Sequence, residues 1–172
     1  GDFSVANGSV YFVASDGRLY KQSLTAGVHR AITPAFGHAA SPTPSPSSRY
    51  VAYVHSTEGT DRLAVVDVEG RTWPQILAQG ADFYMQPCWH LKGRMLAWVE
   101  WDHPRMPWDG TRLVLAIVAY RRDGTPYIRS KRTIAGSHDE AISQPCFSPD
   151  GRSLVYASDR TGWSQLWCRD LA

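Results

Sequence analysis

The feature that most constrains the fold of this chain is an internal repeat. Three windows of 14 residues, 41–54, 86–99 and 144–157, align without gaps. They share a proline near the start, an arginine in the middle and an aromatic residue near the end: Pro42, Pro87 and Pro145; Arg49, Arg94 and Arg152; Tyr53, Trp98 and Tyr156. A weaker fourth copy surrounds residues 10–14. Such self-similarity indicates a chain built from copies of one supersecondary unit.

The spacing of the copies indicates which unit is repeated. The second window begins 45 residues after the first, and the third begins 58 residues after the second. The second interval is 13 residues longer, which indicates an insertion that we place after Trp98. A period of about 40–50 residues is typical of the blades of a β-propeller.

Each copy predicts short strands joined by tight turns. Residues 148–151, Ser-Pro-Asp-Gly, favour a turn, because proline presets φ, aspartate bonds to its own backbone and glycine accepts a positive φ. Asn7-Gly8 favours a type I′ hairpin. Runs of β-branched and aromatic residues follow the turns, and no segment shows a helical apolar stripe over ten or more residues.

We therefore predict an all-β fold, a β-propeller fragment of about four four-stranded blades with the last one incomplete. The single segment 1–172 divides into blades at about 1–35, 36–80, 81–137 and 138–172. Closed propellers have roughly 4–8 blades, so the chain is either an arc of a larger ring or a small ring of four. An arc would expose the faces of its end blades, and we expect two such arcs to pair as a homodimer.

The composition is that of an ordinary globular chain. A charged fraction of 20% and a net charge of +2 give no argument for binding nucleic acid or an anionic membrane. The basic residues Arg129, Lys131 and Arg132 alternate along an expected strand and predict a solvated face. No apolar run approaches the roughly 18 residues of a membrane span, and no secretory signal opens the chain. The first residue is Gly1 rather than Met, so we expect a segment whose targeting signals are missing.

The three cysteines Cys88, Cys146 and Cys168 show no Cys-x-x-Cys pair and no zinc spacing. We expect free, buried thiols, which favour a reducing compartment and thus the cytoplasm. No motif for a metal, a phosphate group or another cofactor is present, so we expect no cofactor.

Several stretches resemble the propeller of the prolyl oligopeptidase family of serine peptidases, in its dipeptidyl aminopeptidase and acylaminoacyl peptidase branch. They are residues 77–87, 96–111, 148–151 and 158–163, with weaker likeness at residues 11–12 and 18–20. The run Asp-His-Pro-Arg-Met-Pro-Trp-Asp-Gly at 102–110 is the most specific. The Ser-Pro-Asp-Gly turn also occurs in the WD40-like repeats of Tol-type propellers. Residues 90–93 and 46–48 depart from that turn pattern, which weakens the repeat rather than the resemblance.

The resemblance implies a propeller that precedes an α/β-hydrolase domain and limits access to a Ser-Asp-His triad. That nucleophile requires a Gly-x-Ser-x-Gly elbow, which this sequence lacks. Gly136-Ser137-His138 has no second glycine and no following helix, so no catalytic residue is assigned and the chain alone is not expected to be an enzyme. The implied partners are the hydrolase domain of the parent protein and its peptide substrate.

Any site on this chain should lie where the loops after the second and fourth strands of each blade open on one side. The candidates for binding or docking are Asp82, Tyr84, Trp101, Asp102, His103, Trp108, Asp109, His138, Asp139, Glu140 and Arg160. Together they could anchor the amine of a peptide or dock the hydrolase domain. The alternative is structural: Asp102 and Asp109 would cap turns, Trp101 and Trp108 would pack the long loop, and His103 would be a hydrogen-bonded loop residue.

Two functions from different classes compete at this point. The first is the non-catalytic, gating propeller of a serine peptidase. The second is a free-standing propeller that binds a protein or peptide through its loop face, because fold alone does not decide function. A complete small enzyme with a channel site is a third and weaker alternative.

Overall fold

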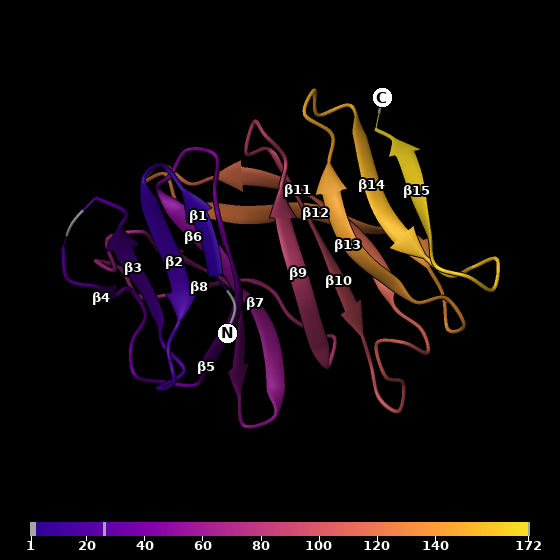
Figure 1. Ribbon diagram of the computed structural model, residues 1–172, viewed down its shortest axis with the longest axis horizontal. Coiled ribbons are helices and arrows are strands. Elements are labelled where there is room, and N and C mark those ends of the chain that lie inside the picture. The colour runs from indigo at the N-terminus through magenta and orange to yellow at the C-terminus, as the bar shows by residue number, and fades with distance from the viewer. Residues whose placement is uncertain (1–2, 26, 172) are drawn as a thin grey trace. The chain divides into compact units, whose positions relative to one another are not determined.

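The computed structural model describes residues 3–25 and 27–171, which form fifteen β-strands and no helix. The strands make four antiparallel sheets in which neighbours along the chain pair with each other (Figure 1). The chain divides into two compact units, Gly1–Gly80 (unit 1) and Ala81–Ala172 (unit 2). The predicted all-β propeller fragment is confirmed. In the described part of the chain, no helix is long and apolar enough to cross a membrane.

Unit 1 contains sheets 1 and 2. Sheet 1 comprises β1 (Phe3–Ala6), β2 (Ser9–Val13), β3 (Leu19–Ser23) and β4 (Arg30–Ala31), and sheet 2 comprises β5 (His38–Pro44), β6 (Tyr50–Thr57), β7 (Thr60–Asp67) and β8 (Gln75–Ala78). Tyr11 and Leu19 of sheet 1 pack against Val51 and Tyr53 of sheet 2 in one buried cluster. The two sheets are therefore stacked face to face, as neighbouring blades are.

Unit 2 contains sheets 3 and 4. Sheet 3 comprises β9 (Phe83–Trp89), β10 (Met95–Trp101), β11 (Arg112–Tyr120) and β12 (Pro126–Gly136), and sheet 4 comprises β13 (Ile142–Phe147), β14 (Ser153–Ser158) and β15 (Gln165–Asp170). Val99 and Leu113 of sheet 3 share a buried cluster with Leu154 and Tyr156 of sheet 4. Among the described residues, sheet 4 has three strands, in agreement with the predicted incomplete blade.

The aromatic residues that mark the repeat occupy equivalent places in the structure. Tyr53, Trp98 and Tyr156 lie in the second strand of their sheets, β6, β10 and β14, and are 1%, 0% and 4% exposed. Each aromatic is the fourth residue of its strand. Because side chains alternate between the two faces of a sheet, the three rings lie on the corresponding face of their sheets. Each 14-residue window therefore covers the same part of its sheet, the end of the first strand and most of the second.

The prolines that the three windows share mark a backbone feature that the sequence did not reveal. Each follows a residue with positive φ: Ser41 (50°), Gln86 (51°) and Gln144 (54°). In each case the pairing register of the first strand with the second shifts at this dipeptide, which is a β-bulge. A non-glycine residue with positive φ is uncommon and costs free energy, so its recurrence in three sheets makes the bulge part of the repeated design.

The predicted insertion is only partly a loop. The β10–β11 connection covers residues 102–111, where the equivalent β6–β7 turn is Glu58-Gly59. Strand β12 has 11 residues and its counterpart β8 has 4. Strand β12 is long because it pairs along the whole of β11, from Tyr120 opposite Pro126 to Arg112 opposite Gly136.

The cysteines are free, as expected, but two of them are not buried. Cys88 is half-buried, and burial raises the pKa of its thiol to about 12. Cys146 and Cys168 are exposed. Both pair with Val155 across sheet 4, on the face opposite Tyr156, and the described residues leave that face open. The prediction of buried thiols was wrong for these two because pattern alone does not show whether a face is covered.

Candidate functional site

The predicted site residues all belong to unit 2, and three connections bring most of them together. These are residues 102–111 between β10 and β11, 137–141 between β12 and β13, and 159–164 between β14 and β15. The Arg105 Nε donates a hydrogen bond to the His138 carbonyl oxygen at 3.3 Å. The Thr111 amide donates to the Glu140 carbonyl oxygen at 2.9 Å. The long insertion is thus held against the link between sheets 3 and 4.

Two of the predicted carboxylates brace the start of the insertion. The Asp82 Oδ2 accepts a hydrogen bond from the His103 amide at 2.9 Å, and the Asp82 amide donates to the Asp102 Oδ1 at 3.0 Å. The Asp102 Oδ2 pairs with the Arg112 Nη2 at 2.7 Å. Burial alone would raise the pKa of Asp102, but the hydrogen bonds from Arg112 and the Asp82 amide outweigh it and lower that pKa. Asp102 is therefore ionised and neutralised in place.

The same arginine links the insertion to the interior of sheet 3. Arg112 also lies 3.6 Å from the Oε1 of Glu100, a buried residue that is 7% exposed. The Glu100 Oε2 accepts a hydrogen bond from the Trp98 Nε1 at 2.8 Å, and the Lys131 Nζ lies 4.0 Å from the same carboxylate. A buried carboxylate requires such partners, because an unpaired charge in the interior is costly.

The aromatic candidates differ in their exposure. Phe83 stacks on Trp101 with a centroid distance of 5.1 Å and meets the edge of His103 at 4.9 Å. Tyr84 is buried, and its hydroxyl accepts a hydrogen bond from the Ala81 amide at 3.1 Å. Trp108 is 67% exposed. The packing role thus fits Trp101 and His103, whereas Trp108 offers a free apolar surface.

The remaining acidic candidate in the insertion, Asp109, caps a turn, which is the alternative that the sequence left open. Its Oδ2 accepts a hydrogen bond from the Met106 amide at 2.9 Å, and its own amide donates to the Met106 carbonyl oxygen at 2.9 Å. Asp139 is exposed, and its amide donates to the Ser137 Oγ at 3.2 Å. Neither carboxylate points to a catalytic role.

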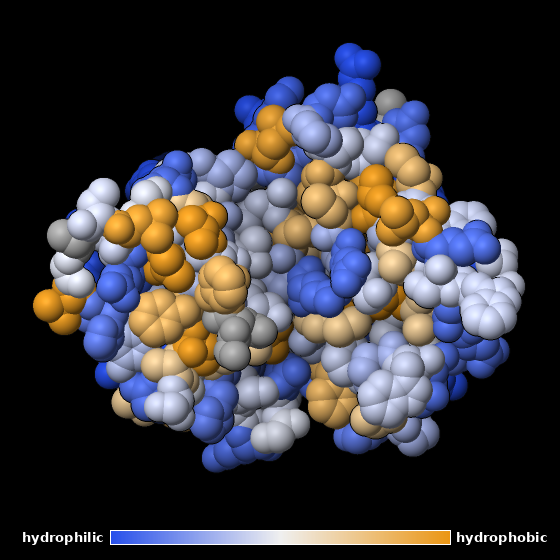
Figure 2. All heavy atoms as spheres, viewed as in Figure 1, coloured by the Kyte–Doolittle hydropathy of each residue, from blue (hydrophilic) through white to orange (hydrophobic). Residues whose placement is uncertain are grey.

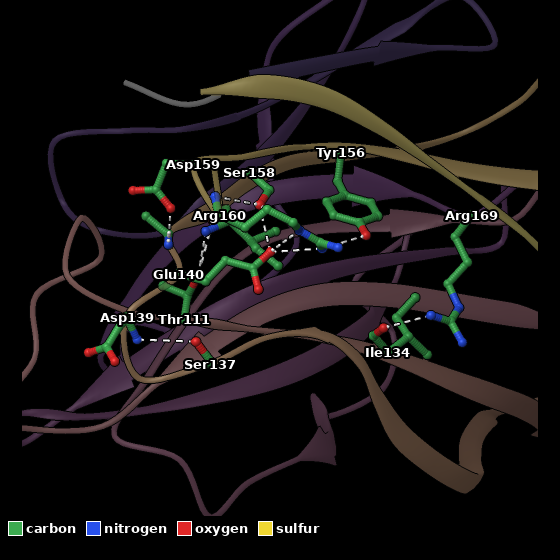
Figure 3. Close-up of polar contacts among 12 residues, drawn as sticks. Thr111, Ile134, Ser137, Asp139, Glu140, Tyr156, Ser158, Asp159, Arg160 and Arg169 are labelled. Atoms are coloured by element: carbon green, nitrogen blue, oxygen red, sulfur yellow. Dashed lines mark hydrogen bonds and ion pairs between the residues drawn. The ribbon is translucent and has the colours of Figure 1, made fainter. Parts of the chain in front are cut away.

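A second ion pair lies at the same end of sheet 4 (Figure 3). The Glu140 Oε1 accepts hydrogen bonds from the Ser158 Oγ at 2.5 Å and the Arg160 Nε at 3.0 Å. The Arg160 Nη2 also donates to the Tyr156 hydroxyl at 3.1 Å, and its guanidinium lies 4.2 Å from the ring centroid of Trp167. This carboxylate is therefore also neutralised by a cation.

A cavity of about 260 Å³ opens where the connections meet. Its lining residues are Asp102, Arg105, Gly110, Thr111, Arg112, Thr133, Gly136, Ser137 and His138. Gly110 permits the close approach of the two connections, because a Cβ there would lie 2.2 Å from the His138 carbonyl oxygen. The cavity wall thus combines two arginines, a histidine and three hydroxyl groups with one paired carboxylate.

This chemistry favours anions over amines. The sequence suggested that the carboxylates could anchor the charged amine of a peptide, but Asp102 and Glu140 each already hold an arginine. The groups left to receive a ligand are the exposed His138 ring and the terminal nitrogens of Arg105, whose Nε alone has a hydrogen bond among the described residues. Guanidinium and imidazole donors suit a carboxylate. Within the described ranges, no three His, Cys, Asp or Glu residues cluster to hold a metal ion.

Sequence reasoning missed two arginines of this site. Arg105 and Arg112 were overlooked because arginines on a loop and at a strand start resemble solvated surface. The sequence did contain a signal for Arg112: it and Glu100 have opposite charges and flank the insertion. The structure places the two residues opposite each other in the β10–β11 pair. The pairing register that reveals this contact was not known from the sequence.

Two solved structures of peptide or puromycin hydrolases resemble this chain in both fold and sequence. No protein-family model matches the chain, and no curated protein sequence does so either. A puromycin-hydrolyzing peptidase of Mycobacterium tuberculosis superposes on 98% of the chain with a TM-score of 0.81 and 29% identity. A puromycin hydrolase superposes on 95% with a TM-score of 0.80 and 35% identity. The resemblance to the prolyl oligopeptidase propellers is confirmed.

The match concerns one part of those larger proteins. The chain spans about a quarter of their length, 28% of the first and 27% of the second. A TolB protein from Agrobacterium tumefaciens also superposes on 95% of the chain, with a TM-score of 0.61 and 19% identity. That similarity shows a shared fold alone, whereas the two hydrolases share sequence as well. The two relatives that share sequence with the chain are thus named as a hydrolase and a puromycin-hydrolyzing peptidase.

Proposed function

We propose that this chain is the non-catalytic propeller segment of a prolyl oligopeptidase-type serine peptidase, in which it restricts substrate access and docks an α/β-hydrolase domain. The observation that carries the proposal is the 35% identity to puromycin hydrolase over 95% of the chain, confined to 27% of that protein. Bond cleavage would then proceed through a serine nucleophile of the other domain. The propeller itself would supply no catalytic group and no cofactor.

The loop site of unit 2 is the part of the chain that we assign to docking. It combines the exposed Trp108 with the cavity that carries Arg105 and His138. Aromatic and arginine side chains are the residues that most often anchor protein interfaces. A carboxylate of the hydrolase domain that enters the cavity would pair with Arg105 while Trp108 packs beside it.

The test uses the full-length enzyme with Trp108→Ala and Arg105→Gln. If the site docks the hydrolase domain, both variants should loosen the access route, so long peptides are cleaved faster while kcat/KM for dipeptide substrates stays the same. Leu24→Ala is the control, because Leu24 is also an exposed apolar residue, at 58%, but belongs to unit 1 and lies outside its cavity. An unchanged ratio of long-peptide to dipeptide cleavage in both variants would contradict the docking role.

The chain on its own distinguishes the proposal from the alternatives. We expect no turnover of aminoacyl-nitroanilides by the 172-residue chain, and reproducible turnover would refute a non-catalytic role. Sequencing the gene beyond Ala172 separates the other two functions. A further α/β-hydrolase region with a Gly-x-Ser-x-Gly motif supports the peptidase, and a stop codon supports the free-standing binding propeller.

Pairing of two open arcs remains a separate part of the proposal. Sheet 1 carries Phe3 and Val5 at 67% and 56% exposure, and sheet 4 carries Leu166 at 78%. Figure 2 shows apolar side chains on the surface over β1 and β2. Covering such a surface would be favourable, so we expect the isolated chain to form dimers at micromolar concentration. A monomeric mass by light scattering would exclude that pairing.

A further inference from the structure

Unit 1 holds a cavity of about 140 Å³ that no part of the proposed function uses. It lies between the segment that follows β4 and strands β6, β7 and β8 of sheet 2. The lining residues are Pro34, Phe36, Tyr53, His55, Arg62, Ala64, Trp73, Pro74, Gln75 and Ile76. Most of this wall is aromatic or aliphatic, and Phe36 lies 5.6 Å from the His55 ring between centroids. An apolar cavity of roughly 150 Å³ is large enough to hold a benzene ring.

The hydroxyl of Tyr53 makes this cavity more than a packing defect. Tyr53 is 1% exposed and lines the cavity, yet no hydrogen bond joins its hydroxyl to any residue that the structure describes. Burial raises the pKa of that hydroxyl, so it is a neutral donor. This hydroxyl is not fully enclosed, since the described residues hold one fully buried side-chain polar atom without a partner, the Trp167 Nε1, so solvent or a ligand can reach it. A ligand atom in the cavity would give the Tyr53 hydroxyl a partner.

Arg62 places a positive charge at the wall of this cavity. It is half-buried at the cavity wall, and within residues 3–25 and 27–171 it forms no ion pair. Its neighbour across the β6–β7 pair is His55. Burial, together with the charge of Arg62, lowers the pKa of His55, so that ring is uncharged at neutral pH. With no acidic residue in the wall, the cavity presents one unpaired cation.

We propose that this cavity binds an aryl carboxylate, with the aryl ring between Phe36 and Trp73 and the carboxylate on Arg62 and the Tyr53 hydroxyl. The aromatic walls match the ring, and the guanidinium and the phenol supply donors for the two oxygens. Both a free aromatic acid and the C-terminal aromatic residue of a peptide carry this chemistry. The inference is independent of the docking role, since all its residues lie in unit 1.

Calorimetric titration of the full chain with phenylpropionate tests the site. We expect saturable binding, with phenylpropionamide, which has the same shape and no charge, at least about tenfold weaker. A peptide that ends in phenylalanine, compared with its C-terminal amide, distinguishes the two ligand sources. Binding of the free acid but not the peptide indicates a small-molecule site, and binding of both indicates a site open to chain ends.

Substitutions then assign the binding to this cavity. Arg62→Gln should weaken phenylpropionate by about tenfold and Tyr53→Phe by about fivefold. Arg62→Lys, which keeps the charge, should retain part of the affinity. Arg122→Gln is the matched control, because Arg122 is exposed in unit 2 and should leave the affinity unchanged.

Three results would overturn the inference. They are the absence of binding at millimolar phenylpropionate, equal binding of the acid and the amide, and an equal loss of affinity in Arg122→Gln and Arg62→Gln. Unfolding curves of each variant separate loss of binding from loss of structure. Tyr53→Phe should stay folded, because it keeps the ring and removes a group without a partner among the described residues.

Discussion

The same position of the repeat carries a polar aromatic residue in both units, but only unit 2 provides that residue with a partner. Tyr156 accepts a hydrogen bond from Arg160, and Trp98 donates one to Glu100. Tyr53 of unit 1 has none within the described chain. The rings themselves are equally buried in all three sheets. The repeat therefore keeps a buried ring at this position in all three sheets, whereas the hydrogen-bond partner of the ring's polar atom differs between the units.

This divergence makes two different kinds of site. In unit 2, the long insertion borders a polar cavity that Asp102 and Arg112 line. The ion pairs Asp102–Arg112 and Glu140–Arg160 lie at the same end of the sheets. In unit 1, the equivalent connection is only Glu58-Gly59, and an aromatic cavity with an unpaired cation remains. The residue two positions after the aromatic contributes to the difference, since it is Glu100 in sheet 3 and His55 in sheet 2. Four predictions test the comparison.

The largest effect should come from the shared ring itself. Trp98→Ala removes a side chain that is 0% exposed, and it should lower the free energy of unfolding by about 3–5 kcal/mol in urea titrations. Trp108→Ala changes the same residue type at 67% exposure, and it should cost less than about 0.5 kcal/mol. Similar losses in the two variants would show that the repeated aromatic is not core.

A smaller loss should follow from disturbing the insertion, which only unit 2 has. In Gly110→Ala, the new Cβ would meet the His138 carbonyl oxygen at 2.2 Å and the Ser137 carbonyl oxygen at 2.8 Å. Both contacts are with backbone, so the insertion must move, at a cost of about 1–3 kcal/mol. Thermal unfolding measures this cost, and an unchanged midpoint would mean that the connections are not held together.

One substitution at two equivalent positions should have different signs. Tyr156→Phe removes a hydroxyl that accepts from Arg160, so it should cost about 1 kcal/mol. Tyr53→Phe removes a hydroxyl that has no hydrogen bond within the described chain, so it should be neutral or slightly stabilising in the absence of ligand. Paired urea titrations of the two variants decide the point. A loss at Tyr53 as large as that at Tyr156 would contradict the unpaired hydroxyl.

The smallest effect concerns the ion pairs of unit 1. Hydrogen bonds from Lys21 and Arg30 lower the pKa of Glu69 from 4.5 to about 2. Because the folded pKa is depressed, the pair stabilises the fold above about pH 5, and this contribution is lost as the pH falls toward 2. Its side chain is 36% exposed, so solvent screening keeps the effect below about 1 kcal/mol.

Glu69→Gln measures that contribution. The variant should be less stable than the parent chain at neutral pH, and the difference should vanish near pH 2. Urea titrations at several pH values give the curve. A difference that grows as the pH falls would have the wrong sign for a carboxylate with a lowered pKa.

Most of the fold could be predicted from the sequence because its signals are local. Asn7 and Gly8 both have positive φ, 47° and 70°, as a type I′ hairpin requires. The Asp150 Oδ1 accepts a hydrogen bond from the Arg152 amide at 3.0 Å, as the Ser-Pro-Asp-Gly turn predicted. The extent of β12 was not predictable, because the length of an outer strand depends on the neighbour with which it pairs.

The sequence predicted that the loops after the second and fourth strands lie on one side, but not which side chains pair there. The loops after the second and fourth strands do meet in unit 2, through Arg105 and His138. The interpretation of the carboxylates as amine anchors did not anticipate that Arg112 neutralises Asp102 and that Arg160 neutralises Glu140. Those arginines lie 10 and 20 residues from their partners, so only the folded register shows the pairing.

The sequence by itself determined that this protein is a series of antiparallel sheets with a shared aromatic core position. Alternation, turn chemistry and a repeated period act over a few residues, so they need no knowledge of the whole chain. Tertiary structure alone decided the bulges at Ser41, Gln86 and Gln144 and the polar partner of each buried ring. These features depend on side chains that become neighbours only after folding, and for that reason the unpaired Tyr53 hydroxyl and the Arg62 charge could be found only in the structure.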